Sequence, residues 1–210
     1  MWVGTFQDGL FRRDRDGSVR QFLPDPDDDA ALPSDVVLAL DVDPEGRLWV
    51  ATSRGVAWWD GRGFTPVAGM EDDPPLVVSL GIDDAGRPWF GQRDRVLRPD
   101  GNAGFQRHVV DAVVHGLVDI DPGLTWLATG SGLLALGADG VRRDAYGHPA
   151  LARASLQQAL VDREGSLWLV GMGGVWQLAS GWQRFASFAP AEAGVDGLSN
   201  ELVRGMAPDG

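Results

Sequence analysis

Short apolar runs separated by glycine-containing turns recur along the whole chain. Each run has about four to eight residues, as at 36–40 and 76–80, which suits a β-strand buried on both faces. A turn of the type Asp43-Pro-Glu-Gly46 follows, because aspartate can bond the backbone two residues on and glycine adopts a positive φ cheaply. No segment sustains helical periodicity over three turns. The pattern predicts an all-β protein built of short antiparallel strands.

Tryptophans follow these turns in a common register. Their positions are 2, 49, 89, 126 and 168, so the spacings are 47, 40, 37 and 42 residues. Four short strands in each repeat of this length are typical of a β-propeller blade. Isolated blades would expose two apolar faces, so the sequence predicts that the indoles form the core between neighbouring blades.

The repeats predict a single β-propeller domain over residues 1–210. A partial blade spans 1–22, four full blades span 34–66, 75–107, 112–143 and 154–188, and the first strand of a further blade spans 201–207. Two arrangements remain open. Either the terminal strands pair and close a five-bladed ring, which would remove open sheet edges, or the chain is a fragment of a larger propeller.

Composition removes several classes of function. Cysteine is absent, which excludes thiol catalysis, thiolate metal sites and disulfides. The net charge of −12 argues against nucleic-acid partners. No run of eighteen apolar residues occurs, so no membrane contact is expected from this segment. Acidic clusters at 25–29 and 71–73 are interpreted as solvated loops because they lack the spacing of a calcium loop, although calcium binding stays open.

No catalytic motif is present. The chain has no Gly-x-Ser-x-Gly, no P-loop and no His-Glu-x-x-His, so we expect no catalytic residue, no cofactor and no metal. The histidines are His108, His115 and His148, and a metal site needs three or four ligands that converge. Nothing in their spacing indicates such convergence.

Several stretches resemble the two-component regulator propeller repeats of bacterial signalling receptors. These are Gly197–Val203, Asp162–Trp168 and Trp2–Thr5 with the following Gly9-Leu10. The resemblance implies a periplasmic, ligand-sensing input domain, often for saccharides, in a two-component system. It also implies an adjacent β-sandwich, and a histidine kinase or diguanylate cyclase module elsewhere in the parent receptor. Whether the chain forms a homodimer is left open.

The expected strand order predicts where a ligand would bind. In a propeller blade, the loops that lead into the first strand and those between the second and third strands share one face. Arginines there could bind carboxylates or sugar acids through paired hydrogen bonds. The candidate ligand-binding residues are Gln7, Asp8, Arg54, Arg93, Asp94, Ser131, Arg153, Asn200 and Glu201.

These observations favour a non-catalytic sensor domain that binds a small molecule, a saccharide or a partner domain at the loop face. One alternative is a stand-alone propeller scaffold for protein interactions, which predicts a large apolar patch. The other is an enzyme similar to virginiamycin lyase, a propeller that uses a histidine with a metal.

Overall fold

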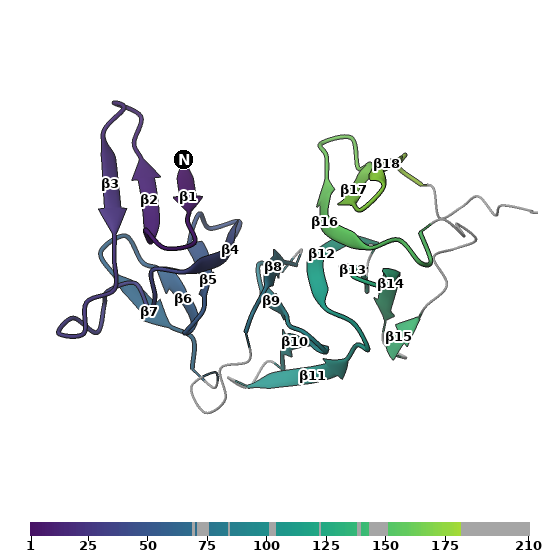
Figure 1. Ribbon diagram of the computed structural model, residues 1–210, viewed down its shortest axis with the longest axis horizontal. Coiled ribbons are helices and arrows are strands. Elements are labelled where there is room, and N and C mark those ends of the chain that lie inside the picture. Colours follow the sequence, from purple (N-terminus) through teal and green to yellow (C-terminus); the bar gives the residue numbers. More distant parts are fainter. Residues whose placement is uncertain are drawn as a thin grey trace, which may run out of the picture.

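The computed structural model describes residues 1–68, 70, 76–83, 85–100, 104–121, 123–137, 140–142 and 151–181. Within these residues the chain folds into eighteen β-strands in five antiparallel sheets, with no helix. Figure 1 shows the sheets following one another along an arc, from β1–β3 to β16–β18. The predicted all-β propeller architecture is confirmed.

Each sheet is a simple meander, and the strands fall into four equivalent positions. First strands are β4 (Val37–Val42), β8 (Ser79–Ile82), β12 (Val114–Asp121) and β16 (Leu156–Val161). Second strands, which carry the repeated tryptophans, are β1 (Trp2–Gly4), β5 (Leu48–Thr52), β9 (Pro88–Gly91), β13 (Leu124–Thr129) and β17 (Leu167–Gly171). Third strands are β2 (Leu10–Arg13), β6 (Gly55–Trp59), β10 (Arg95–Pro99), β14 (Gly132–Gly137) and β18 (Gly174–Leu178). Fourth strands are β3 (Val19–Phe22), β7 (Phe64–Pro66), β11 (Phe105–Val109) and β15 (Gly140–Arg142).

The three middle sheets have four strands each, in the orders β4-β5-β6-β7, β8-β9-β10-β11 and β12-β13-β14-β15. The first and last sheets have three described strands each, β1-β2-β3 and β16-β17-β18. The described strands are not joined into a closed ring by hydrogen bonds, since each pairs only within its own sheet. The strand predicted at 201–207, and with it the proposed closure, lies outside the described residues.

Apolar cores fill the spaces between consecutive sheets, because alternate residues of each second strand face opposite neighbours. In β5, Leu48 and Val50 pack toward the first sheet, whereas Trp49 and Ala51 pack toward the third. The same alternation in β13 places Leu127 against the third sheet and Trp126 against the fifth. Every residue of β5 is buried, which agrees with its apolar run from Leu48 to Ala51.

Four of the five repeated tryptophans, Trp2, Trp49, Trp89 and Trp126, take part in these cores, as predicted, whereas Trp168 does not. Trp49, Trp89 and Trp126 are buried, whereas Trp2 and Trp168 are half-buried in the first and last sheets. Trp2 lies against Phe22 and Trp59, with ring centroids 5.6 and 6.1 Å away.

The turn aspartates have a second role that the sequence pattern did not reveal. Besides accepting backbone N–H bonds in the turn, Asp43 accepts a hydrogen bond from the indole Nε1 of Trp49 at 3.0 Å. Trp89 donates to Asp83 at 3.3 Å in the same way, and Trp168 donates to Asp162 at 2.8 Å. Each of these three turns is therefore tied to the tryptophan six residues further on.

Candidate functional site

Two kinds of connection meet on one side of the arc, which we call the loop face. The loops between second and third strands are hydrogen-bonded to the segments that lead into first strands. Gly9 N–H donates to the carbonyl of Asp35 at 2.9 Å, and Val114 N–H donates to the carbonyl of Gln92 at 2.9 Å. The hydroxyls of Ser34 and Ser53 lie 2.8 Å apart across a similar junction. The Asp-x-x-Gly turns lie at the opposite ends of the strands, on what we call the turn face.

Seven of the nine residues predicted to bind ligand are described, and they lie in these loop-face connections and are exposed. Arg54, Ser131 and the pair Arg93 and Asp94 occupy loops between second and third strands, and Arg153 precedes β16. Gln7 and Asp8 lie in the corresponding loop between β1 and β2. Asp94 forms an ion pair with Arg95 at 2.7 Å. Asn200 and Glu201 lie outside the described residues.

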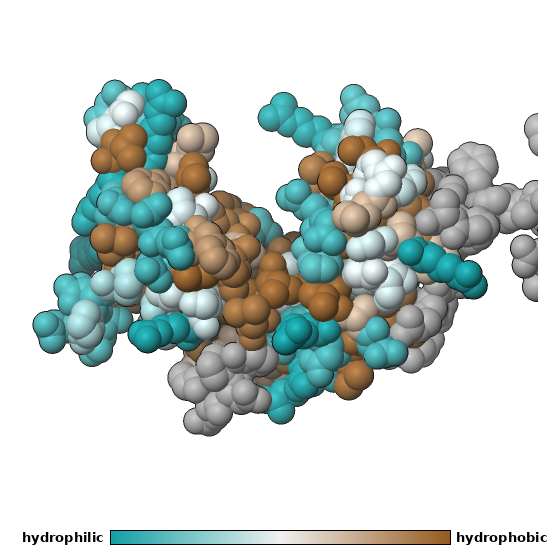
Figure 2. Space-filling view, in the orientation of Figure 1, coloured by the Kyte–Doolittle hydropathy of each residue, from teal (hydrophilic) through white to brown (hydrophobic). Residues whose placement is uncertain are grey.

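A cavity of about 420 Å³ lies where the first strands approach one another. We call it the central cavity. It is lined by residues of β4, β12 and β16, by β8 with the preceding Val78, and by Gly4 of β1. Figure 2 shows the molecule hollowed between the β1–β3 side and the β16–β18 side, with hydrophobic surface along the floor of the hollow. None of the seven described residues that the sequence suggested as ligand-binding lines this cavity.

β-Bulges bring specific side chains to this cavity. In β4, Val37 pairs with Thr52 and Ala39 with Ala51, which leaves Leu38 without an opposing residue. The same register shift leaves His115 unopposed in β12 and Gln157 unopposed in β16. Val78 lies just before β8, in the position that Leu38 has in β4. The equivalence follows from the strand register, since the next residue, Ser79, pairs with Gly91 as Ala39 pairs with Ala51. A bulge re-aims the extra side chain, and all four of these residues line the central cavity.

Among the described residues, the lining of the central cavity carries no charged side chain. Burial lowers the pKa of His115, which keeps its imidazole neutral at pH 7. His115, Gln157 and Gln158 offer hydrogen-bond donors and acceptors, while Leu38, Leu40 and Leu80 offer apolar surface. A volume in the range of about 300–1,000 Å³ is usual for small-molecule sites. The cavity therefore suits an uncharged ligand with both polar and apolar faces.

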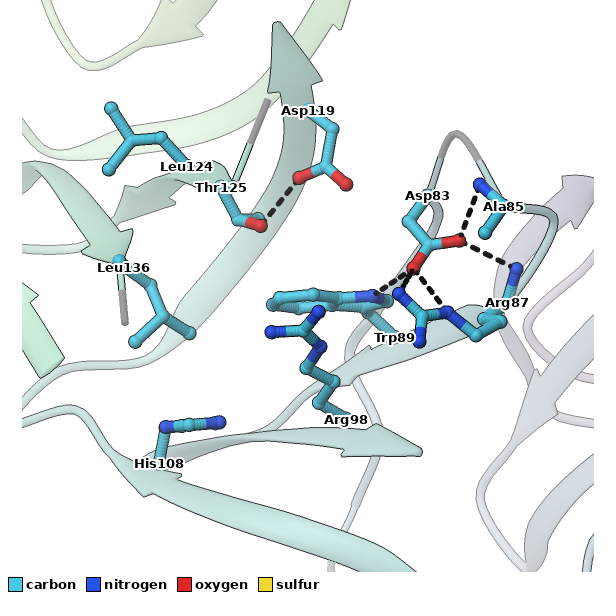
Figure 3. Close-up of a pocket in the computed structure, with 12 residues that line it drawn as sticks. Asp83, Ala85, Arg87, Trp89, Arg98, His108, Asp119, Leu124, Thr125 and Leu136 are labelled. Atoms are coloured by element: carbon cyan, nitrogen blue, oxygen red, sulfur yellow. Dashed lines mark hydrogen bonds and ion pairs between the residues drawn. The ribbon is translucent and has the colours of Figure 1, made fainter. Parts of the chain in front are cut away.

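The two described histidines, His108 and His115, do not converge. His115 lines the central cavity, whereas His108 lies on β11 and lines a smaller cavity between the third and fourth sheets, shown in Figure 3. In the described part of the chain, no group of three or more His, Asp or Glu side chains could hold a metal ion. In the first acidic cluster, the carboxylates of Asp25 and Asp28 accept backbone N–H bonds at 3.0 and 2.9 Å. His148 and the cluster at 71–73 lie outside the described residues.

Consecutive four-stranded antiparallel blades, whose first strands surround one cavity, define the class of this protein as a β-propeller. Residues 31–54 match the family model described as two component regulator propeller, which confirms the resemblance seen in the sequence. No curated protein matches the chain in sequence. No helix in the described residues is long and apolar enough to cross a membrane.

Solved structures share the fold at low sequence identity. The extracellular domain of a B. thetaiotaomicron protein assigned to the hybrid two-component systems aligns with a TM-score of 0.70 and 17% identity, over 95% of this chain and 28% of that chain. PorZ, a surface component of the type-IX secretion system of Porphyromonas gingivalis, aligns with a TM-score of 0.61 and 16% identity, over 87% of this chain and 31% of that one. The chain thus spans about a quarter of the length of the receptor domains that it resembles.

Virginiamycin B lyase from Staphylococcus aureus also shares the fold, with a TM-score of 0.59 and 14% identity, over 82% of this chain and 60% of that chain. Extracellular receptor domains and an enzyme are therefore both found among the structural neighbours. Because one fold hosts many functions, the choice between binding and catalysis depends on the site.

Proposed function

We propose that the chain is a non-catalytic, ligand-sensing input domain of a bacterial signalling receptor, and that its central cavity binds an uncharged saccharide. The observation that carries this proposal is the set of bulges that present Leu38, His115 and Gln157 to one cavity, which Val78 also lines and which has no charged side chain among its described lining residues. The propeller repeat at 31–54 and the fold similarity to extracellular receptor domains support the receptor assignment. A position outside the cytoplasm, beside a β-sandwich and a signalling module, belongs to the same proposal.

The chemistry of the cavity fits a sugar better than an acid. A saccharide presents hydroxyl groups at its edges and C–H groups on its faces. Gln157, Gln158 and the neutral His115 can donate to and accept from hydroxyls, and the leucine side chains can pack against C–H groups. Arg54, Arg93 and Arg153, which we predicted as contacts for sugar acids, lie on the exposed loops instead.

Binding at this place provides a physical route to a signal. The cavity is lined by strands of every described sheet, so one ligand contacts several blades at once. Adjacent first strands are in close contact there: a Cβ added to Gly116 of β12 would meet the backbone nitrogen of Ala159 in β16 at 2.8 Å. A ligand that favours one packing of these strands shifts the propeller toward it, by an amount set by its differential affinity for the two packings.

A protein-docking scaffold is less well supported. Exposed large apolar side chains are concentrated in the first and last sheets, for example Val3, Val19, Leu160 and Val175. Among the described residues these two sheets have a neighbouring sheet on one side only. Their exposure follows from that position.

Isothermal titration calorimetry with defined disaccharides tests the proposal. The neutral probes are maltose, cellobiose and xylobiose, and the charged comparison is digalacturonate. We expect one of the neutral disaccharides to bind. The double variant His115→Ala/Gln157→Ala should weaken that binding by at least about tenfold, which corresponds to losing one or two hydrogen bonds.

Single variants Arg54→Ala, Arg93→Ala and Arg153→Ala provide the matched control, because each removes a polar side chain from the loop face and leaves the cavity unchanged. They should retain the affinity of the unmodified chain. Binding of digalacturonate that depends on these arginines would contradict the proposal, and so would the absence of binding by all three neutral disaccharides.

A further inference from the structure

A second cavity, of about 150 Å³, lies between the third and fourth sheets. We call it the rim cavity. It is lined by residues of the turn between β8 and β9, by Gly123 at the turn before β13 and by Gly137 at the end of β14. These turns belong to the turn face, so the rim cavity opens away from the loops that were predicted to bind ligand. With about a third of the volume of the central cavity, it is too small for a disaccharide.

Arg98 of β10 supplies an uncommitted cation to this cavity. Its guanidinium carbon lies 4.8 Å from the ring centroid of Trp89, and Figure 3 shows it over the indole and directed into the pocket. Stacking uses the faces of the guanidinium and leaves its N–H edges available. Arg98 forms no ion pair with a described carboxylate, whereas Arg87 in the same cavity is bound to Asp83 at 2.7 Å.

His108 of β11 presents a second open group to the same space. In the hairpin of β10 and β11, Val96 pairs with His108 and Arg98 with Gln106, which places Arg98 and His108 two residues apart on one face of the sheet. The Nε2 atom of His108 is buried and has no hydrogen-bond partner in the described structure. A buried polar atom left in this state is costly, and it indicates that a partner belongs there.

The carboxylates nearby are already engaged. Asp83 accepts hydrogen bonds from the side chains of Arg87 and Trp89, and Asp119 accepts one from the hydroxyl of Thr125. Leu124 and Leu136 form an apolar wall on the fourth-sheet side of the cavity, facing Arg98 and His108 in Figure 3. The open polar groups and the apolar wall therefore lie on opposite sides of one small space.

We infer that the rim cavity binds a small free carboxylic acid. Its carboxylate would accept hydrogen bonds from the guanidinium edge of Arg98 and from the Nε2–H tautomer of His108, and its short alkyl end would pack against Leu124 and Leu136. The planar fork of arginine matches a carboxylate, and a stacked arginine is already oriented for it. This site is independent of the proposed saccharide site, which lies on the first strands.

The test is an NMR titration of the complete 210-residue chain with sodium acetate, followed on the imidazole resonances. His108 is assigned with the variant His108→Gln. Acetate should shift the His108 signals in a saturable manner, while acetamide, which has nearly the same shape without the charge, should not. His115, in the central cavity, should be unaffected and serves as an internal reference. Equal shifts of the His108 signals with acetate and acetamide would overturn the inference, and this comparison needs only the unmodified chain.

Arg98→Met should weaken acetate binding by at least about tenfold, because it removes the charged donor and keeps the stem that lies against Trp89. Arg107→Met is the matched control, because it removes the same charge from an exposed arginine one residue before His108. An equal loss in both variants would indicate a nonspecific charge effect and overturn the site. A blocked aspartate, N-acetyl-aspartate methylamide, distinguishes the source of the carboxylate. Weaker binding than acetate supports a free acid, whereas tighter binding would assign the cavity to an acidic side chain of a partner protein.

Discussion

Replacing Asp43 with asparagine should destabilise the fold through the core between the second and third sheets. The Asp43 carboxylate is buried and accepts three hydrogen bonds: from Arg47 N–H at 2.8 Å, from Arg47 Nε at 2.7 Å and from Trp49 Nε1 at 3.0 Å. Asparagine keeps one oxygen, which can still accept the backbone bond. Its amide group then faces two donors, so the buried indole N–H of Trp49 loses its partner.

The magnitude follows from these losses. An unsatisfied buried donor costs about 1–3 kcal/mol. The Arg47 side chain is 42% exposed, so its ion pair with Asp43 adds at most about 1 kcal/mol. We therefore expect Asp43→Asn to lower the free energy of unfolding by about 1–4 kcal/mol. For a chain of this size, each kcal/mol lowers the melting temperature by about 2–4 °C.

Urea denaturation followed by tryptophan fluorescence measures this change. The matched control is Asp60→Asn, because Asp60 is exposed and its Oδ1 accepts both turn N–H bonds, from Arg62 at 2.7 Å and Gly63 at 2.8 Å. Asparagine retains that oxygen, so the control should be far milder. Asp162→Asn should fall between the two, since Ser166 stands where the second sheet has Arg47 and Trp168 is only half-buried. If Asp43→Asn were no more destabilising than Asp60→Asn, the assigned role of the carboxylate would be wrong.

Acidification should destabilise the protein below about pH 4, the ordinary pKa range of aspartate. Burial alone would raise the pKa of Asp43 and Asp83, but hydrogen bonds from the arginine and tryptophan together lower it, and the Trp168 bond lowers the pKa of Asp162. The stabilisation from these three aspartates is therefore complete above the pKa of aspartate in the unfolded chain, and it is lost as the pH falls through their pKa values in the folded protein. Burial raises the pKa of Asp41, so this group acts in the opposite sense. Thermal melts from pH 5 to pH 3 should show this fall, and a flat profile would contradict it. Gly116→Ala should lower the free energy of unfolding by about 1–3 kcal/mol, because the added Cβ would meet the Ala159 nitrogen at 2.8 Å. The control Gly130→Ala should be tolerated, because this glycine lies in an open loop. Equal denaturation midpoints for the two variants would refute the close contact of β12 and β16. Ser79→Ala should cost about 1–2 kcal/mol by removing the 2.6 Å bond from its buried hydroxyl to the Val114 carbonyl, and Ser131→Ala, at an exposed hydroxyl, is its neutral comparison.

The architecture was predictable because the features that specify it are local. A turn of the form Asp-x-x-Gly, a tryptophan six residues after the aspartate and an apolar run of strand length all lie within a few residues of one another, and the repeat multiplies the signal. Where one repeat departs from the common pattern, the difference is also local. At the fourth repeat, Asp119 bonds Thr125, a pairing for which the repeat pattern gave no precedent.

The candidate site was not predictable to the same degree, because it depends on strand register. Leu38, His115 and Gln157 reach the central cavity through bulges, and a bulge is a property of two paired strands. In the sequence, Leu38 is one more residue of an apolar run. The prediction therefore selected exposed polar loop residues such as Arg54, whereas the residues that line the cavity come from the strands just below the loops.

Resolving which cavity a neutral disaccharide enters tests the central claim most directly. His115 reports on the central cavity and His108 on the rim cavity, so one titration of the isotope-labelled chain with the disaccharide that binds in calorimetry observes both. We predict saturable shifts of the His115 imidazole, with a dissociation constant equal to the calorimetric value, and an unchanged His108. Shifts confined to His108, or to loop-face residues such as Arg54 and Arg93 with His115 unmoved, would contradict the account.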